Sequence, residues 1–142
     1  MFRTFLCAIF VLTISKGVAQ SSPTRAGIVF NNQNWQTVSA LAAKTHRYIF
    51  VDAYTSWCGP CKALKETTFR DASVAAYFNT HFVNFGADME KGEGLQLSEN
   101  WKITAYPTLL FFNPDGQLVL MKTGFVNAGQ LIALAKEALS KK

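Results

Sequence analysis

Two cysteines separated by two residues, Cys58 and Cys61, are the side chains of this sequence best suited to covalent chemistry. A disulfide between them closes a very small loop, and because the stabilisation from a cross-link grows with loop length, it would add little to folding. Such a pair suits repeated formation and cleavage, in which one thiolate attacks a disulfide and a second thiol resolves the mixed disulfide. We predict that Cys58 is the nucleophile and Cys61 the resolving thiol.

The flanking segments predict how the pair is positioned. Residues 48–54 are apolar at nearly every position, which is typical of a strand buried on both faces. Good helix formers follow the second cysteine and Pro60 suits a first turn, so we expect a helix over 60–69. Cys58 then lies at the helix N-terminus, where free N–H groups and the helix dipole favour a thiolate. We expect Cys58 to be the more exposed thiol with the lower pKa.

A metal site is the main alternative for the pair. Zinc sites use four protein ligands, or three and a water. Outside the pair, only His46 and His81 are good partners, and neither has ligand spacing to the cysteines. We therefore predict redox chemistry, with no metal and no cofactor beyond the Cys58–Cys61 disulfide.

Asp52 is a carboxylate inside the strand that is otherwise apolar. Burial disfavours the charged form, so the pKa of this group should be raised, as is common at functional sites. The alternative is an aspartate at the end of the strand that bonds to backbone and moves no protons.

The order of these motifs resembles the thioredoxin superfamily. Residues 49–52 followed by Cys58-Gly59-Pro60-Cys61-Lys62 are similar to its active-site segment, residues 105–109 to its cis-proline loop, and residues 122–124 to a later glycine region. The resemblance covers about residues 27–140. Residues 67–71 and 123–125 are more similar to the C-terminal thioredoxin-like domain of the bacterial transmembrane thiol:disulfide interchange proteins.

The resemblance implies roles for two further residues. Asp52 would be the buried acid that moves protons for Cys61, although Asn84 stands where thioredoxins usually have a lysine, so that Asp52 should be harder to ionise. Pro107 would follow a cis peptide bond, which X–Pro bonds adopt at small cost. That turn would bring the backbone of Tyr106 beside the disulfide, where an extended client could pair with it. A trans turn is the alternative.

The resemblance also implies an apolar surface on which clients dock around the thiols. Its expected residues are Trp57, Gly59, Pro60, Tyr106, Gly124 and Phe125. For Trp57, plain packing beside the site is the alternative. Tyr106 replaces a smaller aliphatic residue of thioredoxin, so client preference does not transfer.

The uncharged Gly59-Pro60 spacer gives no extra stabilisation to the reduced pair, which favours a reducing protein over a strong oxidant.

The rest of the chain predicts an α/β fold with a mixed sheet covered by helices on both faces, the thioredoxin fold. The expected strands are 27–30, 82–87, 108–112 and 118–121 beside 48–54, with 82–87 as a second interior strand. The expected helices, besides 60–69, are 35–45, 71–77, 95–101 and 127–140. One thioredoxin-like domain would span residues 27–142, after a flexible lead-in over 20–26.

Residues 1–19 have the pattern of a signal peptide. Arg3 precedes a ten-residue apolar stretch, and Gly17-Val18-Ala19 offers a cleavage site before Gln20. The stretch is short for a membrane span, although an uncleaved anchor is the alternative. Without this leader the chain has 12 basic and 9 acidic residues, a charge of +3 that is too small to indicate nucleic-acid binding.

These patterns predict an exported thiol-disulfide oxidoreductase that acts in the periplasm of a bacterium. We expect a monomer that reduces disulfides of envelope client proteins and receives electrons from a membrane thiol donor. A disulfide isomerase and an apocytochrome c reductase are alternatives, but isomerases usually need a dimer or a second domain to hold their clients. A non-enzymatic adaptor with incidental thiols is a third.

Overall fold

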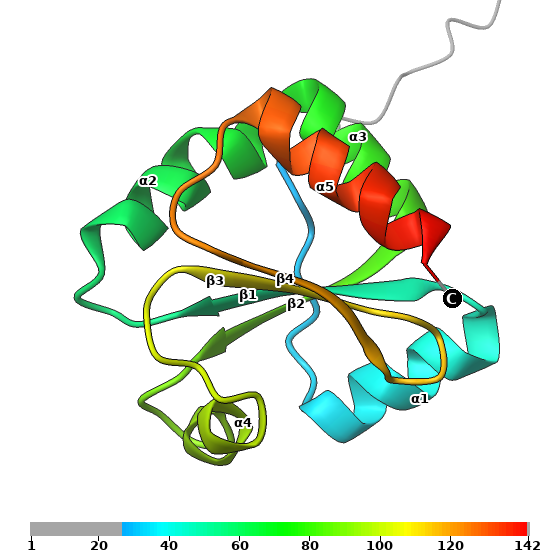
Figure 1. Ribbon diagram of the computed structural model, residues 1–142, viewed down its shortest axis with the longest axis horizontal. Helices are drawn as coiled ribbons and strands as arrows, with labels where there is room; N and C mark the ends of the chain where they lie inside the picture. Colours follow the sequence, from blue (N-terminus) through cyan, green and yellow to red (C-terminus); the bar gives the residue numbers. More distant parts are fainter. Residues whose placement is uncertain (1–26, 142) are drawn as a thin grey trace, which may run out of the picture.

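A four-stranded mixed sheet forms the centre of the protein (Figure 1). The computed structural model describes residues 27–141, so the predicted signal peptide and lead-in lie outside the described residues. The strands are β1 (Tyr48–Tyr54), β2 (Phe82–Asp88), β3 (Thr108–Phe112) and β4 (Leu118–Thr123). Their order is β2-β1-β3-β4, with β1 parallel to β2 and antiparallel to β3, and β3 antiparallel to β4.

Helices cover both faces of the sheet. They are α1 (Trp35–Thr45), α2 (Gly59–Glu66), the short 3-10 helix η1 (Thr68–Arg70), α3 (Ala72–His81), α4 (Gly94–Asn100) and α5 (Ala128–Ser140). Figure 1 shows α2, α3 and α5 above the sheet and α1 and α4 below it. The predicted thioredoxin fold is confirmed. Among the described residues, no helix combines the length and the apolar character that crossing a bilayer requires.

The central strand β1 contributes to two separate hydrophobic cores because its side chains alternate between the faces of the sheet. Phe50 packs with the aromatic and aliphatic side chains of α2, α3 and α5, including Leu64, Phe78 and Leu131. Ile49 and Val51 point to the other face and join the core that α1 and α4 cover. With both faces buried, the strand is held rigidly, and the loop that follows it starts from a fixed position.

Asparagine and aspartate side chains start three of the helices, as their sequence positions predict. Asn34 accepts from the backbone of Thr37, and Asp71 accepts from the backbone of Ser73 and Val74. Asn127 forms a reciprocal capping box with Gln130 at the start of α5. Each cap satisfies backbone N–H groups that have no partner within the helix and stabilises it by about 1 kcal/mol.

The segment 27–30 is not a strand, contrary to the sequence prediction, and β2 is therefore an edge strand rather than an interior one. The backbone N–H groups of this segment bond elsewhere: Ile28 donates to the carbonyl of Phe69, and Val29 donates to the side chain of Asn79. Only Asn31 forms a bridge to β2.

The predicted helix over 60–69 is two helices. α2 ends at Glu66, and the chain turns at Thr67, whose backbone dihedrals of −118° and −80° are not helical. The 3-10 helix η1 follows, and its Thr68 hydroxyl donates to the carbonyl of Val126 at 2.8 Å. This bond ties the end of α2 to the loop before α5. The next helix runs to His81, four residues beyond the prediction.

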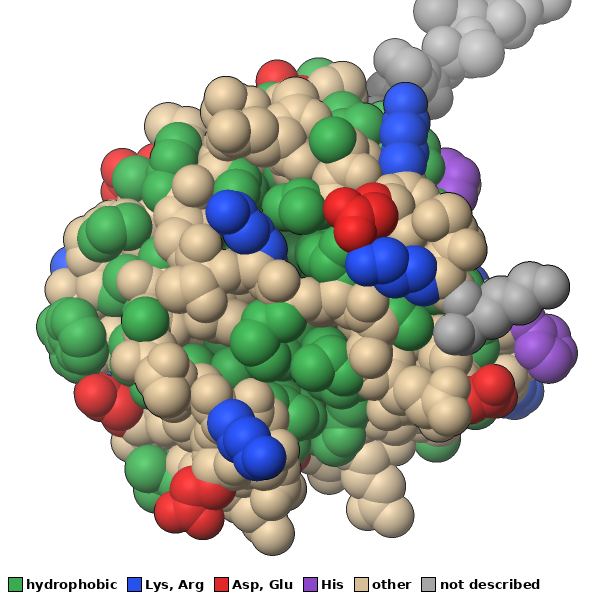
Figure 2. Space-filling view, viewed as in Figure 1, with side chains coloured by type: hydrophobic (Ala, Val, Ile, Leu, Met, Phe, Trp, Pro, Cys, Tyr) green, Lys and Arg blue, Asp and Glu red, His purple; other side chains and the backbone are tan. Residues whose placement is uncertain are grey.

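Charged side chains are scattered over the face seen in Figure 2, where acidic and basic groups alternate with polar and apolar ones. That distribution agrees with the weak net charge of the sequence.

Candidate active site

The two cysteines form a disulfide at the start of α2. Cys58 is the N-cap residue of this helix, and Cys61 lies in its first turn, with 5.3 Å between their Cα atoms. The backbone N–H of Cys61 donates to Sγ of Cys58 at 3.2 Å, and the N–H of Cys58 donates to the carbonyl of Thr55 at 3.3 Å. An N–H group directed at the sulfur, together with the helix dipole, favours the thiolate of Cys58 after reduction.

Both cysteines are buried in this oxidised form. Cys58 is 2% exposed and Cys61 is 1% exposed. The predicted difference in exposure is therefore absent while the disulfide is closed. A difference in exposure or pKa between the two thiols can therefore arise only after the disulfide is reduced.

Three loops are joined by direct contacts, and one of them carries Trp57, the residue before Cys58. The Tyr106–Pro107 peptide bond is cis, and the carbonyl of Pro107 accepts from the backbone N–H of Gly124 at 2.8 Å. Gly124 has a φ of +94°, in the left-handed region that favours glycine. The rings of Tyr106 and Trp57 meet edge to face, with 6.0 Å between their centroids. These contacts link four of the predicted site residues, namely Trp57, Tyr106, Pro107 and Gly124.

Two of the residues predicted to dock clients are large, apolar and exposed. Trp57 is 65% exposed and Phe125 is 47% exposed. Gly59 and Pro60, between the cysteines, are also exposed. The indole N–H of Trp57 donates to the carboxylate of Glu90, a residue that the sequence patterns did not single out.

Asp52 lies on β1, between Gly86 of β2 and Leu109 of β3, and its side chain is 1% exposed. Its Oδ1 has no hydrogen-bond partner among the described residues, and its Oδ2 lies 4.0 Å from Nζ of Lys65. Burial raises the pKa of this carboxyl from 3.8 to about 7, and the charge of Lys65 opposes part of the rise. The predicted direction of the pKa change is confirmed.

The expectation that Asp52 has no cation nearby is wrong. Asn84 does replace the strand lysine, and its amide donates to the carbonyls of Val29 and Phe78. Lys65 of α2 instead approaches Asp52 from the helix layer, with Nζ 3.0 Å from the ring centroid of Tyr54. The spacing in the sequence could have found it: Lys65 is four residues after Cys61, so both lie on one face of the helix.

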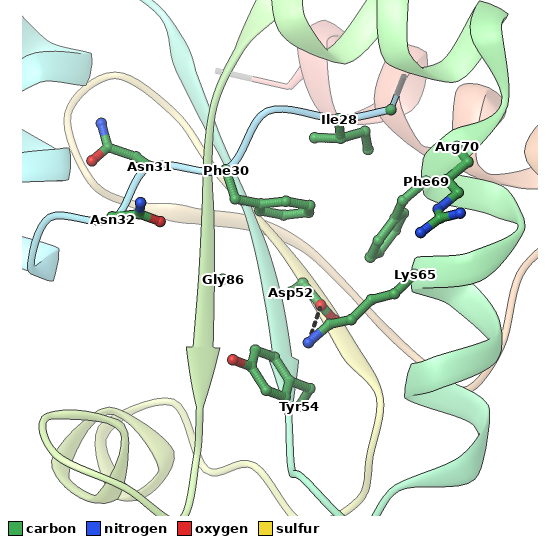
Figure 3. Close-up of a pocket in the computed structure, with 11 residues that line it drawn as sticks. Ile28, Phe30, Asn31, Asn32, Asp52, Tyr54, Lys65, Phe69, Arg70 and Gly86 are labelled. Atoms are coloured by element: carbon green, nitrogen blue, oxygen red, sulfur yellow. Dashed lines mark ion pairs between the residues drawn. The ribbon is translucent and has the colours of Figure 1, made fainter. Parts of the chain in front are cut away.

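A pocket of about 300 Å³ opens beside this pair. Figure 3 shows Lys65 reaching from α2 across the pocket towards Asp52, with the ring of Tyr54 next to the ammonium group. The other walls come from α2, η1, β2 and the segment before α1, including Phe30, Phe69 and Arg70. Asp52 is thus a buried carboxyl at the wall of a cavity that solvent can reach.

No cluster of three or more histidine, cysteine or acidic side chains that could hold a metal ion occurs within residues 27–141. The described part of the chain thus holds a disulfide at the start of α2 and, at β1, a buried carboxyl paired with a lysine from that helix.

Comparison with known proteins agrees with this geometry. The family model of the thioredoxin-like domain matches residues 35–139. The thiol:disulfide interchange protein DsbD of Pseudoalteromonas atlantica is 29% identical over 126 residues, which cover 87% of this chain and 21% of the relative. Thioredoxin-2 of Pyricularia oryzae is 34% identical over 80 residues, covering 55% of this chain and 42% of the relative.

A solved structure extends the likeness along nearly the whole domain. The solution structure of a protein from Bacteroides thetaiotaomicron, described as a candidate disulphide-isomerase, has 41% identity and a TM-score of 0.73, covering 82% of this chain and 97% of that one. A thioredoxin from Thermus thermophilus, at 20% identity and a TM-score of 0.65, shares the fold.

The chain belongs to the thioredoxin-like family. Family membership and the Cys58–Cys61 disulfide together define a thiol-disulfide oxidoreductase. The chain spans about a fifth of the length of the DsbD relatives that it matches.

Proposed function

We propose that this protein is an exported protein-disulfide reductase that acts on envelope proteins. The observation that carries the proposal is the disulfide at the N-terminus of α2, with an uncharged Gly59-Pro60 spacer. A strong oxidant needs its reduced form stabilised by a deeply lowered thiol pKa, and no charged side chain lies between these cysteines to supply that effect. A dithiol of this kind gives up its electrons to client disulfides.

In the proposed cycle, the Cys58 thiolate attacks a client disulfide and releases one client sulfur as a thiolate, which takes up a proton. Cys61 loses its proton to Asp52 and attacks Sγ of Cys58 in the mixed disulfide. The Cys58–client bond breaks as the Cys58–Cys61 bond forms, so the client gains two electrons and the protein loses two. The exposed Trp57 and Phe125 and the Tyr106–Pro107 loop form the surface on which the client docks.

Export is proposed from the pattern of residues 1–19. In an oxidising compartment the disulfide must be reduced again after each cycle, and a membrane thiol protein is the donor that this location favours. The relatives named thiol:disulfide interchange proteins support a donor of that chemical class.

The test is reduction of insulin by dithiothreitol, with and without the chain over residues 20–142. We expect the protein to accelerate precipitation of the insulin B chain, and Cys58→Ser to abolish the acceleration. The Cys61→Ala variant should accumulate a mixed disulfide with clients in envelope extracts. If the wild-type protein gives no acceleration and the Cys61→Ala variant traps no complex, the protein is not a reductase.

Disulfide isomerisation is a second candidate, favoured by the 41% identity to the protein described as a candidate disulphide-isomerase. It is distinguished by reactivation of scrambled ribonuclease. Faster reactivation than that given by an equal concentration of glutathione, without acceleration of insulin reduction, would favour the isomerase.

A further inference from the structure

Lys65 connects the helix that carries the thiols to the buried carboxyl of β1. Its Nζ lies 4.0 Å from Oδ2 of Asp52 and 3.0 Å from the ring centroid of Tyr54. Its side chain is 40% exposed, whereas that of Asp52 is 1% exposed. The lysine therefore extends from the protein surface and places a positive charge next to a buried carboxyl (Figure 3).

We infer that Lys65 is a positioning residue, which keeps Asp52 ionised at the moment when Cys61 must lose its proton. The inference rests on the proposed function, and it identifies the residue that favours the ionised form of Asp52 at the same site. Lys65 and Cys61 are four residues apart on α2, so the lysine and the resolving thiol share one face of that helix. A single helix thus presents the proton donor and the cation that acts on the proton acceptor.

The charge balance around Asp52 supports this role. Burial raises the pKa of Asp52, and Lys65 is the charged group that opposes the rise. Asp88 and Lys91, which form an ion pair at 3.3 Å, act on the neighbouring Tyr54, and Arg70 lines the same pocket. Oδ1 of Asp52 has no hydrogen bond among the described residues that would stabilise its charge. Its ionised form therefore depends on the ammonium group of Lys65.

Tyr54 holds the ammonium group in place. A cation over the face of an aromatic ring is attracted to it, and more strongly when the cation is partly desolvated. Burial lowers the pKa of Lys65, while the charges of Asp52 and Asp88 oppose that effect. The ring thus fixes the position of the ammonium group, and the two carboxylates favour its protonated form.

The resolving step has a defined balance. The Cys61 thiol gives its proton to the carboxylate of Asp52, and the resulting thiolate attacks Sγ of Cys58. The bond from Cys58 to the other sulfur breaks, and that sulfur leaves as a thiolate with the electron pair. The rate of this step follows the ionised fraction of Asp52 and rises with pH.

The experiment uses 5,5′-dithiobis(2-nitrobenzoate) as the disulfide and stopped-flow absorbance as the readout. The reduced chain over residues 20–142 releases one nitrothiobenzoate when Cys58 attacks, and a second when Cys61 resolves the mixed disulfide. The rate of the second release is measured from about pH 5 to about pH 9. Wild type is compared with Lys65→Gln, Lys65→Arg and Lys62→Gln. The last variant removes an equal charge from an exposed position of α2 outside the pocket lining.

We expect Lys65→Gln to move the midpoint of the pH profile up by about one unit, at the lower end of the effect of an opposite charge, because the lysine is part-exposed. With the pKa of Asp52 at about 7 in the wild type, the second release slows about fivefold near pH 7. Lys65→Arg should restore the wild-type midpoint, and Lys62→Gln should leave it unchanged.

A double variant separates action through Asp52 from any other role. In the Asp52→Asn background, Lys65→Gln should cause no further shift of the midpoint, because the group on which the lysine acts is gone. An equal shift in both backgrounds, or none in the wild-type background, overturns the inference. A wild-type chain that releases no nitrothiobenzoate would instead contradict the proposed function, so the two failures differ.

Discussion

The indole of Trp57 is bound to the carboxylate of Glu90 by a hydrogen bond of 2.9 Å that joins positions 33 residues apart. Trp57 directly precedes the nucleophile that we propose, and Glu90 lies in the loop between β2 and α4. This loop therefore orients the most exposed aromatic ring of the proposed docking surface.

Glu90→Ala should weaken client docking while leaving the chemistry of the thiols unchanged. Loss of one hydrogen bond at an exposed site is worth about 1 kcal/mol, so the KM for insulin should rise about twofold to fivefold with kcat unchanged. Steady-state kinetics measure this difference. Glu99→Ala, which removes an exposed glutamate of α4, is the matched control. A fall in kcat alone would show that Glu90 does not act through docking.

The two cysteines should react differently once the disulfide is reduced. Cys58 has the helix N-terminus and the N–H of Cys61 to stabilise its thiolate. Iodoacetamide should therefore label Cys58 at least about tenfold faster than Cys61 at neutral pH. Peptide mass spectrometry after a short labelling pulse measures the ratio. Faster labelling of Cys61 would reverse the assigned roles.

Asp52 should make folding stability depend on pH. Its pKa is about 7 in the folded protein, against 3.8 ordinarily. The folded state thus holds an extra proton between these values, and stability falls as the pH rises from about 4 to about 7, then levels off. Asp52→Asn removes this dependence, so its stabilising effect should grow by about 2 to 3 kcal/mol between about pH 5 and about pH 8.

Urea unfolding of the oxidised protein across that pH range measures this difference. Asp115→Asn, which changes an exposed carboxyl in the turn before β4, is the control and should give a curve parallel to the wild type. If the Asp52→Asn curve is also parallel, Asp52 is not a buried acid with a raised pKa.

The proposed signal peptide gives a prediction that is independent of the active site. Protein recovered from the envelope fraction of an expressing bacterium should begin at or near Gln20, because Gly17-Val18-Ala19 offers the cleavage pattern. Intact-mass spectrometry measures the N-terminus. Retention of Met1 on most molecules would contradict cleavage and favour an anchor.

Local patterns in the sequence were sufficient to predict the elements that carry the thiols. The continuous apolar run of β1 identifies a strand buried on both faces. Pro60 after Cys58 identifies the start of α2, and Asn34, Asp71 and Asn127 mark the starts of other helices. Each of these signals depends only on residues within one turn or one strand. A short stretch of sequence is therefore enough to predict the element.

Contacts between distant elements were harder to predict. No cation was expected beside Asp52, because Asn84 of β2 stands where thioredoxins usually have a lysine, but α2 supplies one through Lys65. The bond between Trp57 and Glu90 spans two loops without periodic pattern. The edge position of β2 depends on where the backbone of residues 27–30 finds its partners, which only the packed fold determines.

The burial of the oxidised sulfurs has a consequence for electron flow. Because Cys58 is 2% exposed and Cys61 is 1% exposed, a free thiol must approach through the surrounding loops before it can attack the disulfide. A partner protein that fits the exposed side chains of Trp57 and Phe125 can hold a protruding cysteine against the buried disulfide, whereas a small thiol has no such surface to hold it there. Under the proposed function, the closed disulfide would therefore select its electron donors by their fit to this surface.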